Sequence, residues 1–308
     1  MQKISDKFNT PAWHWMLHAP ENRRLSKRGR NVAYEIVKSA LRWDVSVPQG
    51  FSLCGRLPYI NCTSMTLRKQ ERRLASIKPE AVGKRTTWNA LADGFNAPYA
   101  IRANLLTRRR LKFWMLLTDG VRPLAYAQRS VSFDKASIDH EYLAFEKSVQ
   151  NQGHGAKVLA NALAVYPLMG ISKITLTAGL SAGSAVWPRL GFSPVSLPEW
   201  SKLRIVISRN LASLDPNVAQ AFQNVHGRNL EVAVQAVLAS DKPSAIFELV
   251  DVDPGSAAAK AAGLRHGIAG ELLSGGHWRG QLEINGAGGR RLQRYLQSKN
   301  VAIPMLPA

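Results

Sequence analysis

The stretch Gln150-Asn151-Gln152-Gly153-His154-Gly155 decides the interpretation of the fold. It separates a predicted strand, which ends near residue 146, from a predicted helix over 156–166. Two glycines just before a helix leave several backbone N–H groups uncovered, and these groups point to one place. Such a loop predicts an anion-binding site, above all for a phosphate.

Two common nucleotide-binding motifs do not fit this loop. A dinucleotide-binding motif requires Gly or Ala where Val158 stands, and an acidic residue about 20 positions later. A P-loop requires Gly-Lys-Ser/Thr, whereas the chain has Ala156-Lys157-Val158. Taken alone, the loop is also compatible with an ordinary glycine turn before a helix.

Hydrophobic periodicity predicts a mixture of strands and helices around the loop. Strands are expected over 111–118, 123–133, 138–146 and 171–177, with helices over 86–98, 156–166 and 181–190. The last of these helices ends in Arg189-Leu190-Gly191-Phe192. Further along, helices are expected over 198–214, 217–226, 229–240, 256–263 and 289–298, and one or two strands over 272–286.

Gln150, Gly153, Gly155 and the later Leu190-Gly191-Phe192 resemble the GNAT family (GCN5-related N-acetyltransferases). That family carries Gln/Arg-x-x-Gly-x-Gly/Ala between a strand and a helix. A strand, a second helix and a Leu-Gly-Phe ending follow in the same order. The resemblance implies an α/β (α+β) fold with a mixed, splayed β-sheet flanked by helices.

Three parts are expected on this basis. They are a basic N-terminal extension over 1–100, an acetyltransferase core over 101–195, and a mainly helical part over 196–308 with a late β-hairpin. The helices over 198–263 are either an insertion, with the late strands completing the sheet, or an appended domain. A structure that places 277–284 beside 171–177 would support the insertion.

The resemblance implies that acetyl-CoA is the co-substrate and that its pyrophosphate lies on the backbone amides of Gln152 to Lys157. The pantetheine arm would pair with the preceding strand, where the Phe145 amide would polarise the thioester carbonyl as an oxyanion donor. Candidate coenzyme-binding residues are Leu143, Phe145, Gln150, Gln152, Gly153, His154, Gly155, Ala156, Lys157 and Ser184. Lys157, Lys173 and Arg189 are candidates for the 3′-phosphate.

The implied reaction is direct attack of an amine on the thioester, which requires that the amine lose a proton. Asp139 and Glu141 are the candidate bases; they share a face of a period-two strand, with His140 opposite. The alternative for each is a surface charge or a salt bridge. No metal-binding Cys spacing is present, and no metal is expected.

One departure from the family concerns the general acid. Many members have a Tyr where this chain has Trp187, and an indole N–H cannot usefully release a proton. Protonation of the leaving thiolate by water, a substitute Tyr166 or Tyr142, and loss of catalysis all remain open. The family's Asn and Ala on this helix are replaced by Leu180 and Gly183, so Ser181 or Ser184 would bind the coenzyme instead.

The charge is concentrated at the start of the chain. The net charge is +20 over 308 residues, and residues 1–110 hold 21 basic and 7 acidic side chains. Trp13, Trp15, Trp43 and Trp88 lie among these basic clusters. Basic and aromatic side chains together suit nucleic acid or another polyanion, although tryptophans that pack a subdomain are the alternative.

No apolar run approaches the ~20 residues that a membrane span needs, and no transmembrane or secretory segment is expected. Two cysteines, Cys54 and Cys62, favour reduced thiols and a cytoplasmic protein. Three functions therefore compete: an acetyl-CoA-dependent enzyme acting on an amine, an acyltransferase acting on nucleic acid or a nucleic-acid-bound target, and a non-catalytic binding module of the same fold.

Overall fold

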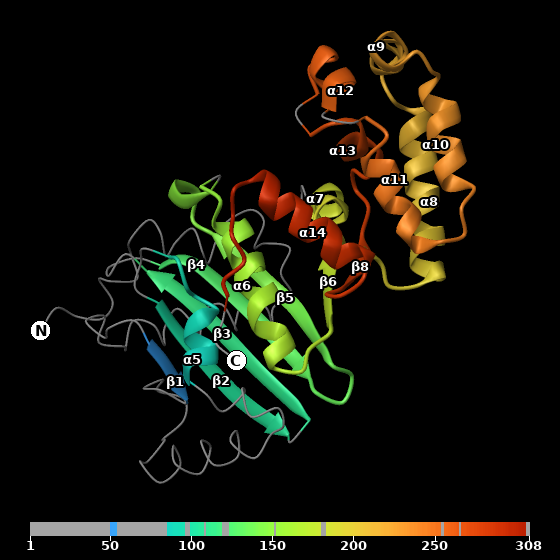
Figure 1. Ribbon diagram of the computed structural model, residues 1–308. Coiled ribbons are helices and arrows are strands. Elements are labelled where there is room, and N and C mark those ends of the chain that lie inside the picture. The colour runs from blue at the N-terminus through green and yellow to red at the C-terminus, as the bar shows by residue number, and fades with distance from the viewer. Residues whose placement is uncertain are drawn as a thin grey trace, which may run out of the picture. The chain divides into compact units, whose positions relative to one another are not determined.

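The computed structural model in Figure 1 describes most of the chain beyond residue 84. The described residues are 50–53, 85–95, 99–107, 109–118, 123–150, 152–179, 183–253, 256–264 and 266–305. They form two compact units: one within residues 1–172 together with the end of the chain from 299, and one over 173–298. Each unit is described by itself.

The first unit is built on an antiparallel meander. It runs through β2 (Tyr99–Thr107), β3 (Arg110–Thr118), β4 (Pro123–Ser132) and β5 (Ser137–Phe145). β1 (Gly50–Leu53) pairs in parallel with the free edge of β2. The sheet is therefore mixed, and β5 follows β4 as the last strand of the meander.

Two helices cover one face of this sheet (Figure 1), α5 (Arg85–Ala90) and α6 (His154–Leu168). Trp88 of α5 is fully buried and packs edge-on against Phe113 of β3, with ring centroids 5.2 Å apart. Alternate residues of β3 and β5 face the helices, which is why side chains such as Leu111 and Ile138 are buried. This layer is the core of the first unit.

The pairing of β4 with β5 is interrupted by a β-bulge. Gln128 lies opposite Tyr142 and Arg129 lies opposite His140, so Glu141 has no partner on β4. An extra residue of this kind bends its strand and turns its side chain out of the regular alternation. Glu141 therefore occupies a position that a regular strand would not give it.

The second unit has a small sheet. β6 (Lys173–Ala178) pairs antiparallel with β8 (Trp278–Glu283), which also pairs with the two residues of β7 (Ser193–Pro194). The structure thus places 278–283 beside 173–178, as the insertion hypothesis requires. Residues 272–286 contain a single strand, and its partners are β6 and β7 rather than a neighbour in a hairpin.

Helices surround this second sheet. α7 (Gly183–Arg189) follows β6, and α14 (Ala287–Ser298) follows β8. Between β7 and β8 the chain forms α8 (Leu197–Ala212), α9 (Pro216–His226), α10 (Leu230–Leu238), α11 (Ile246–Val250), α12 (Ala257–Ala261) and α13 (Ile268–Leu272). Short 3₁₀ turns occur at Lys147–Val149 and Pro243–Ala245. None of the described helices is long and apolar enough to span a bilayer.

The mixture of helices and strands predicted from the sequence is confirmed, with one clear error. Residues 99–107 form β2, where the sequence predicted no strand. The helix expected over 86–98 ends at Ala90 and continues as a turn through Gly94. Arg102 and the polar neighbours in β2 obscure its period-two pattern, so only the pairing with β3 reveals it.

Candidate functional site

The loop between β5 and α6 exposes a set of backbone donors. Gly153 is the N-cap of α6 and adopts the left-handed conformation, with φ of +79°. The first helical hydrogen bond runs from the Lys157 amide to the Gly153 carbonyl, at 3.1 Å. The amides of Gly153 to Ala156 precede that bond and have no acceptor within the helix. The backbone donors expected for the pyrophosphate run from Gln152 to Lys157. The Lys157 amide is not one of them in the structure, because it already donates to the Gly153 carbonyl.

The end of β5 directs one backbone N–H away from the meander. The Glu146 amide donates to the Leu124 carbonyl of β4 at 2.8 Å. Because neighbouring residues of an antiparallel strand point their polar groups in opposite directions, Phe145 directs its N–H and C=O away from β4. On that side its carbonyl accepts a hydrogen bond from the Gln150 side chain, at 2.9 Å. The Gln150 side chain thus connects the glycine loop to the end of β5 through the Phe145 carbonyl.

Aromatic rings support the start of α6. The His154 ring lies between Phe95 and Phe145, with centroids 5.5 and 6.2 Å away and nearly parallel planes. Burial, followed by the nearby Lys157 charge, lowers the pKa of His154, so the ring is neutral at pH 7. His154 therefore acts mainly as a flat support for the loop.

The turn after α5 is tied to the same helix. Lys157 donates to the Gly94 carbonyl, and Asn161 donates to the carbonyls of Leu91 and Asp93 at 3.1 and 2.9 Å. The sequence did not predict this contact between 91–95 and α6. Asp93-Gly94 signals a turn there, but a turn signal does not say what the turn contacts. Lys157, a candidate for the 3′-phosphate, is thus already bound to a backbone carbonyl.

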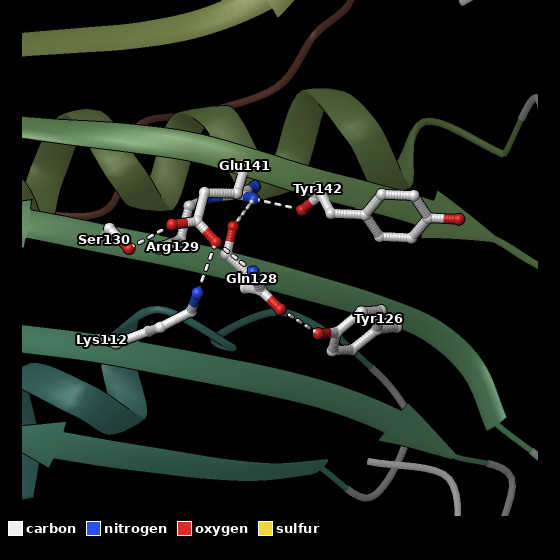
Figure 2. Close-up of polar contacts among 7 residues, drawn as sticks. All are labelled: Lys112, Tyr126, Gln128, Arg129, Ser130, Glu141 and Tyr142. Atoms are coloured by element: carbon white, nitrogen blue, oxygen red, sulfur yellow. Dashed lines mark hydrogen bonds and ion pairs between the residues drawn. The ribbon is translucent and has the colours of Figure 1, made fainter. Parts of the chain in front are cut away.

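A polar cluster gathers around Glu141 on the sheet face opposite α6 (Figure 2). The Glu141 carboxylate is 2.8 Å from Lys112 Nζ and accepts hydrogen bonds from Gln128 and Ser130. Burial alone would raise the pKa of Glu141, but the donors Lys112, Ser130 and Gln128 outweigh it and hold the pKa below its ordinary value. The carboxylate is thus a stabilised anion that takes up protons poorly.

Asp139, the other candidate base, lies opposite Ser130 in the strand register. Its side chain is half-buried. Burial lowers the pKa of Arg129, and the negative charge of Asp139 is one of the smaller effects that oppose this shift. Asp139 and Glu141 thus flank the same serine. The structure also brings Lys112 to the Glu141 carboxylate, a contact that the sequence did not predict.

His140 points to the opposite face and belongs to a buried group. Its Nε2 lies 2.9 Å from the Tyr166 hydroxyl of α6. Burial and then the Arg129 charge hold the pKa of His140 well below its usual value, and burial raises the pKa of Tyr166. Tyr166 therefore supports the α6 side of the sheet, whereas Tyr142 packs against Tyr126 with ring centroids 5.6 Å apart.

The remaining candidates lie in the second unit. Ser184 is 4% exposed, and Trp187 packs edge-on against Phe192 with centroids 5.3 Å apart. Lys173 lies 3.9 Å from Glu283, and Arg189 donates to the His266 carbonyl at 2.9 Å. Both cations that were expected to bind the 3′-phosphate in this unit therefore already contact groups of the chain.

Several sequence expectations fall outside the described residues. These are the basic clusters and tryptophans before residue 85, the two cysteines, and Leu180 and Ser181. Trp88 is the member of the basic-aromatic set that the structure describes, and it is buried in the core. The parts of the chain in view also contain no cluster of three His, Cys, Asp or Glu side chains able to hold a metal ion.

No protein-family model, curated protein or solved structure matches this chain. Its function is therefore inferred from the geometry of its own residues.

Proposed function

We propose that the protein is a coenzyme A-dependent N-acyltransferase with a GNAT-like core, which transfers an acetyl group from acetyl-CoA to an amine. The observation that carries the proposal is the glycine loop between β5 and α6, with left-handed Gly153 and the amides up to Ala156 at the helix start. Fixed backbone donors at a helix N-terminus suit a pyrophosphate.

The residues present fit the coenzyme's other needs. Gly155 places no side chain over the loop, and a Cβ there would lie 3.9 Å from the Phe145 ring. The Phe145 N–H points away from β4, where it can donate to a thioester oxygen. A single donor of this kind contributes about 3 kcal/mol to acyl transfer.

The reaction proposed is direct attack by a neutral amine on the thioester carbon. A C–N bond forms and the C–S bond breaks; the electron pair of the C–S bond leaves with the thiolate, and the attacking nitrogen releases one proton to water. Thiols have a pKa near ~8.5, so the thiolate is a fair leaving group and can take its proton from water. This route requires no tyrosine at the position of Trp187.

Isothermal titration with acetyl-CoA tests the binding step. Gly155→Asp places a carboxylate where the pyrophosphate would lie, and we expect it to weaken binding at least tenfold. Ala219→Asp makes the same charge change on exposed α9 and serves as the control. Failure of the wild-type protein to bind millimolar acetyl-CoA would overturn the proposal.

A thiol-release assay with a panel of primary amines tests the transfer step. Amine-dependent release of coenzyme A is expected from the wild-type protein. Binding of acetyl-CoA without release in the presence of any amine would instead support the non-catalytic module, to which Trp187 points.

A further inference from the structure

Three neighbouring strands contribute the groups that surround Glu141. Lys112 comes from β3, Gln128 and Ser130 from β4, and Glu141 itself stands at the bulge of β5. Lys112 and Gln128 approach one carboxylate oxygen, and Ser130 approaches the other. Because three donors hold it, the carboxylate has one orientation.

Tyr126 determines which end of the Gln128 amide faces Glu141. Its hydroxyl donates to Gln128 Oε1 at 2.9 Å, so the amide NH₂ is turned toward the carboxylate (Figure 2). Tyr126 is 3% exposed, and burial raises its pKa far above the ordinary value, so the hydroxyl is protonated at pH 7 and can donate. The two hydrogen bonds, from Tyr126 to Gln128 and from Gln128 to Glu141, are thus both donated toward the carboxylate.

We propose that Tyr126 is a positioning residue which, through Gln128, holds Glu141 as an oriented anion that binds an N–H of the acyl acceptor and does not act as a general base. The inference rests on the proposed acyltransferase function. An ionised carboxylate offers about four acceptor sites, and three are filled here, which leaves one site on the oxygen that Ser130 contacts.

The charged and titratable groups around Glu141 are consistent with this role. Lys112 faces it from β3 and Tyr126 lies beyond Gln128 on β4, while Asp139 and Tyr142 are close on its own strand. Arg129 is buried, and its guanidinium donates a hydrogen bond to the Tyr142 carbonyl next to the bulge. Proton uptake by Glu141 would weaken its contacts with Lys112, Ser130 and Gln128.

Carbon NMR titration of the Glu141 carboxyl in the full chain tests the positioning step. Tyr126→Phe is expected to raise the measured pKa by about half a unit, the equivalent of one hydrogen bond. Lys112→Met should raise it by about one unit or more. Tyr166→Phe removes a buried hydroxyl on the other face and should leave it unchanged.

If the pKa of Glu141 is unchanged in Tyr126→Phe, the positioning role is overturned, whether or not the protein binds acetyl-CoA. Should Tyr126→Phe fail to fold, Gln128→Met removes the same connection at a half-buried position and makes the same prediction. Absence of acetyl-CoA binding overturns the acyltransferase function, and with it the acceptor role, and is measured separately by calorimetry.

The acceptor role is tested with the amine of the panel that the wild-type protein uses best. Glu141→Gln retains an oxygen acceptor but cannot take a proton, and we expect it to lose less than about tenfold in kcat/KM. Loss of about 100-fold or more, which removal of a general base produces, would overturn the inference. Glu141→Leu lacks both functions and provides the lower limit.

Discussion

Two glycines with positive φ serve different purposes at the scale of single residues. Gly153 has φ of +79° and nothing within 4 Å of the place that a Cβ would take. Gly191, in the Leu-Gly-Phe segment, has φ of +90°, and its Cβ would lie 2.1 Å from the Gly288 carbonyl oxygen. Gly153 allows the left-handed turn before α6, whereas Gly191 lets the end of α7 pass closely over the start of α14.

Alanine substitutions separate these two requirements. Gly153→Ala should lower the unfolding free energy by about 1–2 kcal/mol, the strain of a left-handed alanine. Gly191→Ala adds a backbone collision, for which overpacking contributes a further 1–3 kcal/mol, roughly. Urea unfolding measures both losses. Equal losses would contradict the account of the crossing between α7 and α14.

At the scale of elements, Asp253 joins two helices of the segment between β7 and β8. Its buried carboxylate accepts from the amides of Ala258 and Ala259 at the start of α12, at 3.1 and 2.9 Å. It also lies 2.9 Å from Nε2 of His226, the last residue of α9. One side chain thus substitutes for a local cap on α12 and connects that helix to α9.

Removal of the Asp253 carboxylate should lower the free energy of unfolding. Asp253→Ala leaves two buried amides without acceptors, and we expect a loss of about 2 kcal/mol in unfolding free energy. Asp215 caps α9 through the Asn217 amide at an exposed position, so Asp215→Ala should cost only about 1 kcal/mol. Chemical denaturation at pH 7 compares the two variants.

The effect of Asp253 should also depend on pH. Burial would raise its pKa, but the hydrogen bonds from His226 and the amides of Ala259 and Ala258 outweigh burial and lower the pKa. Its contribution is therefore present above the unfolded pKa of about 4 and is lost as the pH falls through the lower folded value. The difference between wild type and Asp253→Ala should shrink below about pH 4, and a constant difference would contradict this.

At the scale of the whole molecule, each of the two compact units has its own core. Trp88 and Phe113 are central to the first, and Trp200 and Trp278 are fully buried in the second. The proposed coenzyme contacts at Phe145 and Gly153 to Ala156 all belong to the first unit. The charge of +14 over residues 1–110 lies mainly outside the described residues.

Acetyl-CoA should stabilise the whole protein by mass action. At a free concentration of 100 times Kd, the unfolding free energy should rise by about 2.7 kcal/mol, which thermal denaturation detects. Hydrogen exchange should slow at the Phe145 and Gly153–Ala156 amides, because a bound ligand would occupy them. Equal protection throughout residues 173–298, with none at the loop, would contradict the placement.

The sequence by itself determined most elements and the glycine loop, because helix periodicity, strand alternation and glycine positions are local signals. The tertiary structure alone decided which residues meet. Lys112 reaches Glu141 only through the register of β3, β4 and the bulge of β5, and β8 joins β6 about 100 residues later in the chain. Local patterns carry no information on strand register or on long-range pairing, and those two features place the donors around Glu141.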